Sequence, residues 1–248
     1  MTRVVVTRSS DDAEPLLAAL REAGMIPVHL PVIATAAADP TPDVDRTISS
    51  LAAGAYSWIV FSSANGVKWF GAALERSGVS IPDGTKVAAV GTATAASLTQ
   101  RGIRVALVPD VHTGTDLAHA LGPGAGRVLL PRPEQAPDAV LEALAVQGWV
   151  PDEVVVYRTV AGAPDPAAVE QVRHGAFDVL TFTSGSTVRF FAELVARPEA
   201  LELGDRKVVC IGPSTAEVAR GAGFPVDAIA RPHTVGGLVE AIATVVGR

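Results

Sequence analysis

Phe61-Ser62-Ser63, followed by Val67-Lys68-Trp69-Phe70, recurs 121 positions later as Phe182-Thr183-Ser184, followed by Val188-Arg189-Phe190-Phe191. The same offset relates Val90-Gly91-Thr92-Ala93-Thr94-Ala95 to Ile211-Gly212-Pro213-Ser214-Thr215-Ala216. A constant offset over such a length indicates two copies of one α/β unit. We therefore expect the ligand site to lie in a cleft between the copies.

The composition supports two domains and narrows the class of function. A chain of 248 residues that is 48% hydrophobic has enough apolar side chains for two cores. The formal net charge of −6 disfavours nonspecific binding to nucleic acid. The sequence contains no signal-peptide pattern and no apolar run of transmembrane length, so we expect a cytoplasmic protein without a membrane partner. The single cysteine, Cys210, excludes a disulfide framework and fits a buried strand.

Short apolar runs rich in β-branched residues alternate with segments of helical period. This alternation is typical of parallel sheets covered by helices on both faces, and it predicts a flavodoxin-like sheet of five strands in each copy. The predicted strands are 3–8, 26–33, 57–62, 86–90, 104–108, 127–132, 153–159, 178–183, 207–211 and 225–229. The predicted helices are 11–23, 42–53, 64–77, 93–101, 114–121, 137–147, 165–174, 185–196, 214–222 and 234–246.

The first strands of the two copies correspond at a different offset. Residues 3–8 resemble residues 127–132, and Gly24 aligns with Gly148, so the offset here is 124. The repeat alone would divide the chain near residue 124 into tandem domains. An exchange that joins the first β-α-β to the last part of the chain stays open.

Small hydroxyl residues follow most of the predicted strands. Ligands of doubly wound sheets bind at the carboxyl ends of the strands, where hydroxyls and free backbone N–H groups suit carboxylates or phosphates. Ser, Thr and Asn are also the preferred N-cap residues of helices, so each loop has a structural alternative. The candidate residues in these loops are Arg8, Ser62, Ser63, Thr94, Arg132, Ser184, Ser186, Ser214 and Thr215.

Motifs for cofactor or metal chemistry are missing from the sequence. It contains no GxGxxG after a strand, no Walker pattern, no HExxH and no readable catalytic triad. His112 and His233 occupy equivalent repeat positions before Thr113 and Thr234, which favours structural roles. Tyr157 ends a predicted strand, where a phenol either relays a proton or packs in the core.

Several motifs, in this order and spacing, resemble the uroporphyrinogen-III synthase family along nearly the whole chain. They are Val6-Thr7-Arg8, Leu30-Pro31-Val32-Ile33, Trp58 to Val67, Val90 to Ala95, Val156-Tyr157-Arg158-Thr159, Phe182 to Ser186, and Ile211 to Ala216. The resemblance implies two α/β domains joined by a two-stranded connection. One domain would contain residues 1–34 and 160–248 and the other residues 36–157, with linkers near 34–36 and 158–160. The family often has Arg-Gly after the strand at 127–132, where this chain has Arg132-Pro133.

The resemblance also implies an activity. The substrate would be hydroxymethylbilane, a linear tetrapyrrole with eight carboxylates, which is cyclised with inversion of ring D and loss of water. Such a lyase needs no cofactor or metal, and controlling the conformation of the substrate is its main task. Tyr157 would assist departure of the hydroxyl. The hydroxyl loops would hold the acetate and propionate groups, and Arg8 and Arg132 would add positive charge.

The resemblance further implies a monomer that acts on a small molecule, receives it from hydroxymethylbilane synthase and serves heme, siroheme or cobalamin formation. Two other classes of function are alternatives. A noncatalytic regulatory module of the same fold would bind a tetrapyrrole or another polyanion. A two-lobed sugar or amino-acid binding protein is disfavoured by the absence of a signal peptide and by an aromatic content of 5%.

Overall fold

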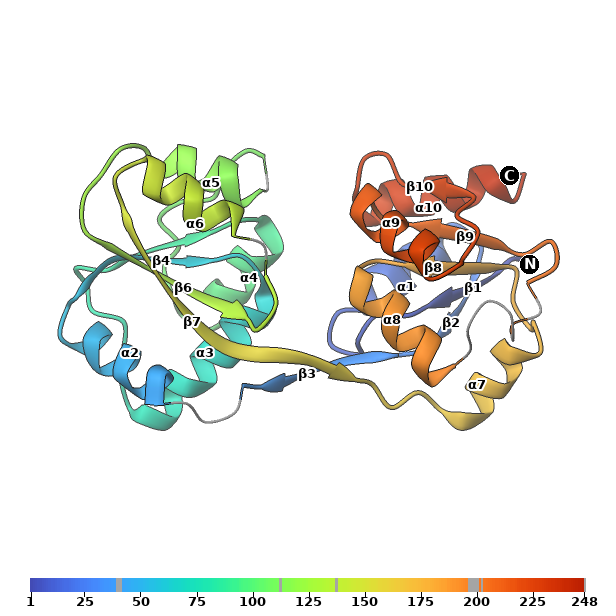
Figure 1. The fold of residues 1–248 in the computed structure, drawn as a ribbon, viewed down its shortest axis with the longest axis horizontal. Helices are drawn as coiled ribbons and strands as arrows, with labels where there is room; N and C mark the ends of the chain where they lie inside the picture. Colours follow the sequence, from blue (N-terminus) through green and yellow to red (C-terminus); the bar gives the residue numbers. More distant parts are fainter. Residues whose placement is uncertain (39–41, 112, 137, 196–200, 202, 248) are drawn as a thin grey trace. The chain divides into compact units, whose positions relative to one another are not determined.

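The computed structural model describes residues 1–38, 42–111, 113–136, 138–195, 201 and 203–247. The chain divides into two compact units (Figure 1). Unit 1 contains Met1–Ala34 and Thr159–Arg248, and unit 2 contains Thr35–Arg158. The chain passes between the units within two strands, β3 (Ile33–Ala37) and β7 (Val150–Ala161).

Unit 1 contains a parallel sheet with the strand order β10-β9-β8-β1-β2. Counted along the chain within the unit, this is the order 2-1-3-4-5 of a flavodoxin-like fold. Its elements are β1 (Arg3–Val6), α1 (Glu14–Glu22), β2 (Ile26–His29), α7 (Pro166–Arg173), β8 (Val179–Phe182), α8 (Gly185–Leu194), β9 (Lys207–Cys210), α9 (Pro213–Gly221), β10 (Ala228–Ile229) and α10 (Val235–Val245).

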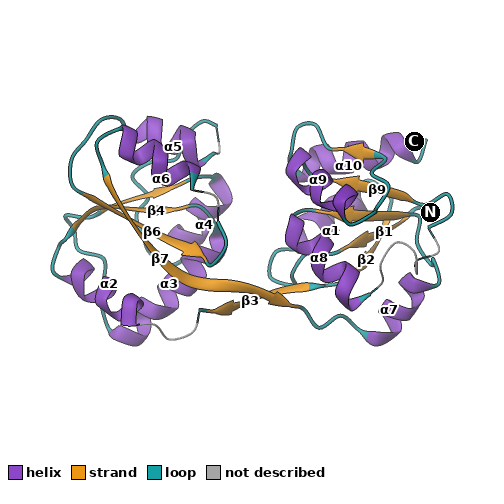
Figure 2. Cartoon of the chain, in the orientation of Figure 1, coloured by secondary structure: helices purple, strands orange, loops and turns teal. Residues whose placement is uncertain are grey.

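Helices cover both faces of this sheet, so its strands read as continuous apolar runs (Figure 2). On one face, α1 and α10 bury Leu16, Leu20 and Leu238. On the other face, α8 and the residues after α9 contribute Phe191 and Phe224, which pack edge-to-face against Phe182 of β8.

Unit 2 contains a second sheet with the strand order β3-β7-β6-β4-β5, in which β7, β6, β4 and β5 pair in parallel. Helices again lie on both faces: α2 and α3 on one, α5 and α6 on the other (Figure 1). Its remaining elements are α2 (Pro42–Ala52), β4 (Tyr56–Phe61), α3 (Ala64–Ser77), β5 (Lys86–Ala89), α4 (Thr92–Gln100), α5 (Gly114–Leu121), β6 (Arg127–Pro133) and α6 (Ala139–Val146).

The prediction of α/β folding with parallel sheets is confirmed, but three predicted strands are wrong in detail. The strand expected at 225–229 is shortened to Ala228–Ile229. The single strand expected at 26–33 ends at His29, and a separate strand, β3, begins at Ile33. Pro31 lies in this interruption and has no N–H to continue a ladder. The strand expected at 104–108 is reduced to an isolated bridge between Leu107 and Ala88. Predicted positions 137 and 196, at helix ends, lie outside the described residues.

Candidate functional site

The loops after the strands of both sheets lead into helices whose starts come in equivalent pairs. Ser63 and Ser184 are the N-caps of α3 and α8, and each side chain accepts a hydrogen bond from a backbone N–H of its helix. Gly91 and Gly212 are the N-caps of α4 and α9, where no side chain caps the helix. The N–H groups in the first turn of α4, and those that follow Pro213 in α9, are not capped by a side chain and suit an anion; Pro213 itself has no N–H.

Ser63 and Tyr157, both predicted as site residues, are in contact in unit 2. The Tyr157 phenol oxygen lies 3.1 Å from Ser63 Oγ, and that Oγ also accepts the N–H of Gly66 at 3.0 Å. Tyr157 is only 6% exposed, whereas Ser62, which precedes Ser63 in the loop after β4, is exposed. The pair thus lies just below the surface at the carboxyl edge of the sheet.

An irregularity in β7 directs Tyr157 toward α3. Arg132 pairs with Val155 and Pro133 with Tyr157, so β7 contains one extra residue at Val156. Side chains of a regular strand alternate between faces, but Val156 and Tyr157 belong to the same apolar cluster, under α2 and α3. A β-bulge of this kind redirects the side chain that follows it.

The other predicted residues of unit 2 differ in their exposure. Thr94 is buried in the first turn of α4. The Arg132 guanidinium is 4% exposed and forms ion pairs with Glu153 at 2.6 Å and with Asp138 at 3.3 Å. Arg132 therefore has carboxylate partners inside unit 2 already, which compensate its charge unless those partners move.

The predicted residues of unit 1 lie at the carboxyl edge of its own sheet. Ser184 forms a capping box with Thr187, and Ser186 accepts a hydrogen bond from Arg189 at 3.2 Å. Thr215 is buried and Ser214 exposed at the start of α9. Arg8 is half-buried after β1. The predicted residues thus form two sets, one in each unit, and their convergence on one cleft stays a prediction.

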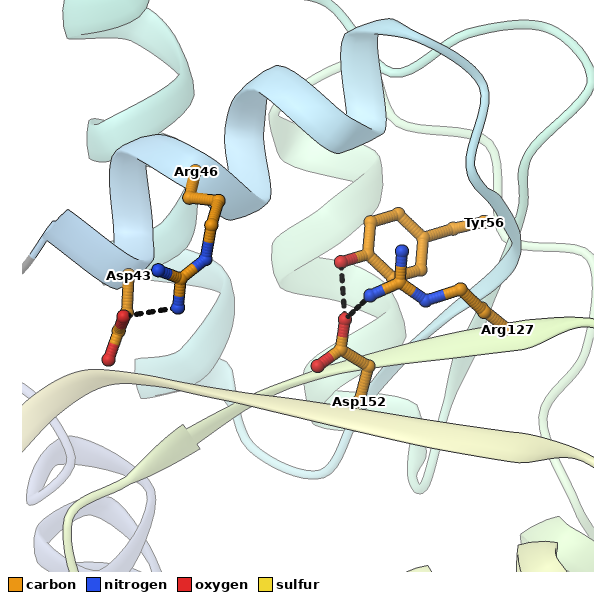
Figure 3. Close-up of polar contacts among 5 residues, drawn as sticks. All are labelled: Asp43, Arg46, Tyr56, Arg127 and Asp152. Carbon is orange, nitrogen blue, oxygen red and sulfur yellow. Dashed lines mark hydrogen bonds and ion pairs between the residues drawn. The ribbon is translucent and has the colours of Figure 1, made fainter.

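Tyr56, Asp152 and Arg127 form a cluster that the sequence did not predict, at the amino ends of β4, β7 and β6 (Figure 3). The Tyr56 hydroxyl donates to Asp152 Oδ2 at 2.5 Å, Arg127 pairs with the same carboxylate, and the Arg127 guanidinium lies 4.7 Å from the ring centroid of Tyr56. Burial, the hydrogen bond and the charge of Asp152 raise the pKa of Tyr56 to about 12. The cluster holds three neighbouring strands together. Figure 3 also shows the exposed ion pair of Asp43 and Arg46 on α2.

His233 and Cys210 have structural roles. His233 Nδ1 lies 2.7 Å from the carbonyl oxygen of Ala230, and His112 is outside the described residues. Cys210 is buried, and this burial raises the pKa of its thiol to about 11. Across the described residues, no group of three His, Cys, Asp or Glu side chains could hold a metal ion. None of the helices described is long and apolar enough to cross a membrane.

An open cavity of about 1140 Å³ lies in unit 2 away from the predicted residues. It is bounded by the end of α3, the start of β5 and residues 101–106, and Lys86 and Arg101 line it. Because Lys86 begins β5, this cavity lies at the amino ends of the strands, opposite the edge that carries Ser63 and Tyr157.

Comparison with known proteins decides the family. The family model described as "Uroporphyrinogen-III synthase HemD" matches residues 14–240, which span both units. The chain belongs to the uroporphyrinogen-III synthase family. A relative named "Uroporphyrinogen-III synthase" from Synechococcus elongatus is 29% identical over 251 residues, covering 96% of this chain and 93% of the relative.

Two further matches show how much of a relative the chain spans and which fold it shares. "Porphyrin biosynthesis protein HemD" from Ruminiclostridium josui is 29% identical over 88% of this chain, but the chain spans only 44% of that relative. A crystal structure of a mutant uroporphyrinogen III synthase from Thermus thermophilus matches with a TM-score of 0.62 at 23% identity, covering 100% of this chain and 99% of the other. At this identity, the match to the Thermus structure supports the synthase fold alone.

Proposed function

We propose that the chain catalyses the uroporphyrinogen-III synthase reaction of porphyrin biosynthesis, in which hydroxymethylbilane is cyclised with inversion of ring D and loss of water. The observation that carries the proposal is the match of the synthase family to residues 14–240, which include both sheets and the Ser63–Tyr157 pair. The reaction makes the enzyme a cyclising lyase that works without a cofactor.

Tyr157 is proposed to protonate the departing hydroxyl of the substrate. Its position supports this role, because the phenol lies beside Ser63 at the carboxyl edge, where parallel sheets bind ligands. Loss of that hydroxyl leaves an electrophilic chain end. The remaining task is to hold the flexible substrate so that ring D recloses inverted.

The acetate and propionate groups are proposed to bind the hydroxyl loops of both units. No side chain caps the N–H groups in the first turn of α4 or those after Pro213 in α9, which supports carboxylate binding there, next to Thr94 in one unit and to Ser214 and Thr215 in the other. Ser62, Ser184 and Ser186 would add hydroxyls. Arg8 would add positive potential, and Arg132 would do so only on release from Glu153 and Asp138.

The two units are proposed to be domains that arose by duplication, with limits at 1–34 plus 160–248 and 36–157. The strand registers support this origin: Arg3 pairs with Ile26 in unit 1, and Arg127 with Val150 in unit 2. We further propose a cytoplasmic monomer that receives hydroxymethylbilane from its synthase.

Isomer analysis tests the proposal. Freshly generated hydroxymethylbilane is incubated with the purified protein, and the products are oxidised and separated by chromatography. We expect type III uroporphyrin well above a control without protein. Type I product alone, formed at the uncatalysed rate by a folded sample, would contradict the enzyme and favour the noncatalytic tetrapyrrole-binding module.

A further inference from the structure

We propose that Ser63 is a positioning residue for Tyr157. The inference rests on the proposed function only for its kinetic consequence. The positioning itself is a structural statement that can be tested without substrate.

The N-termini of α3 and α8 are equivalent in the repeat but are capped differently. In α8, Ser184 Oγ accepts the Thr187 N–H at 3.2 Å, and Thr187 Oγ1 accepts the Ser184 N–H at 3.2 Å. This reciprocal arrangement is a capping box, in which the Thr187 hydroxyl engages the backbone N–H and carbonyl oxygen of Ser184 and not its Oγ. In α3 the position of Thr187 is taken by Gly66, which has no side chain to return the bond.

Ser63 instead contacts a residue from another strand. Its Oγ accepts the Gly66 N–H at 3.0 Å and lies 3.1 Å from the Tyr157 hydroxyl. Both tyrosines of the chain, Tyr56 and Tyr157, belong to unit 2, so Ser184 in unit 1 has no phenol of its own unit to meet. The repeated serine has therefore kept its cap in both units and has gained a second partner in one.

The space around Gly66 is tight. A Cβ at this position would lie 3.1 Å from the carbonyl oxygen of Pro131 and 3.4 Å from Ser63 Oγ. Glycine thus keeps the space beside the Ser63 hydroxyl open.

The decisive variant removes the Ser63 hydroxyl but keeps a residue that caps helices. Ser63→Gly does this, because glycine is tolerated at N-caps and already caps α4 at Gly91. The matched control is Ser184→Gly, which makes the same change at α8. With only two tyrosines, protein labelled with 3-fluorotyrosine gives two fluorine resonances, and Tyr157→Phe assigns them.

We expect the Tyr157 resonance to shift in Ser63→Gly and to stay unchanged in Ser184→Gly, with the Tyr56 resonance unchanged in both. We expect kcat of Ser63→Gly to fall about tenfold with KM within about twofold, and Ser63→Thr, which retains a hydroxyl, to recover most of the loss.

A Tyr157 resonance that stays at its wild-type position in Ser63→Gly would overturn the positioning role, whatever the enzyme does. A shifted resonance without the fall in kcat would overturn its kinetic consequence. Failure of the proposed function is seen separately, as type I product from the wild-type protein.

Discussion

The side chains of Asp152 and Tyr157 point to the same face of β7. In a regular strand, an even-numbered and an odd-numbered position would face opposite sides. Asp152 accepts the hydroxyl of Tyr56, and Tyr56 and Tyr157 belong to one apolar cluster under α2 and α3. The extra residue at Val156 changes the alternation between them. The bulge thus allows one strand to secure the amino end of the sheet and to present a phenol at the carboxyl end.

Replacing Tyr157 with phenylalanine separates its chemical role from its packing. We expect Tyr157→Phe to lower kcat by about tenfold or more, because a positioned proton donor contributes at least that much, and to leave product affinity nearly unchanged. Steady-state kinetics and titration with product measure the two effects. Small and equal effects on both would make Tyr157 a packing residue.

Tyr56→Phe tests the cluster at the amino ends of the strands. The loss of the hydrogen bond to Asp152 should lower the free energy of unfolding by about 1 kcal/mol at about pH 8. Urea denaturation measures the difference. Type III product formation should not change, because the cluster lies at the opposite edge from Ser63.

The same tyrosine gives the stability a pH dependence of known sign. Its pKa is 10.0 for the free group and about 12 in the fold, so the unfolded state loses its proton first as pH rises. The wild type should therefore lose about 1 kcal/mol per pH unit relative to Tyr56→Phe between about pH 10 and 12. A constant difference between the two proteins over that range would contradict the raised pKa.

Gly162 lies where the chain has just entered unit 1 from β7. An added Cβ would lie 2.0 Å from the carbonyl oxygen of Pro31 and 2.8 Å from the Ile33 nitrogen, both of them backbone atoms. Gly162→Ala should lower the free energy of unfolding by about 2 kcal/mol or more. Gly221→Ala is the matched control, since nothing lies within 4 Å of its added Cβ, and its stability should be unchanged or slightly raised.

Unit 2 is continuous in sequence, which makes the proposed domain division testable. Its two apolar clusters draw only on residues of Thr35–Arg158, so this segment should fold when expressed alone. A cooperative thermal transition with near-UV circular dichroism is the expected result. A segment without fixed tertiary packing would show that β3 and β7 need unit 1 to fold.

The contact between Ser63 and Tyr157 shows where sequence reasoning stops. The sequence predicts both residues for the site, but for separate roles, and 94 positions separate them. Hydroxyl residues after apolar runs can be read from local pattern, because caps and turns are local. Which hydroxyl contacts the phenol depends on strand order and on a β-bulge, and neither can be predicted from the local sequence pattern.

Other contacts that the sequence did not predict also depend on how distant segments are arranged in the fold. Asp152, Arg127 and Tyr56 are ordinary residues in three separate runs, and only the order β7-β6-β4 brings them together. The sequence predicts that Arg132 faces an anion, yet its neighbours in the fold supply two carboxylates. Its pairing depends on residues in β7 and at the start of α6, which spacing alone could not place.

The sequence by itself determined the alternation of buried strands and amphipathic helices, the repeated helix starts and the family, because these depend on periodicity, local capping and residue identity. The tertiary structure decided the strand order, the direction in which the Tyr157 side chain points, and the partners of Ser63 and Arg132. These depend on contacts between distant segments, and a single extra residue in one strand reverses the face that a side chain presents.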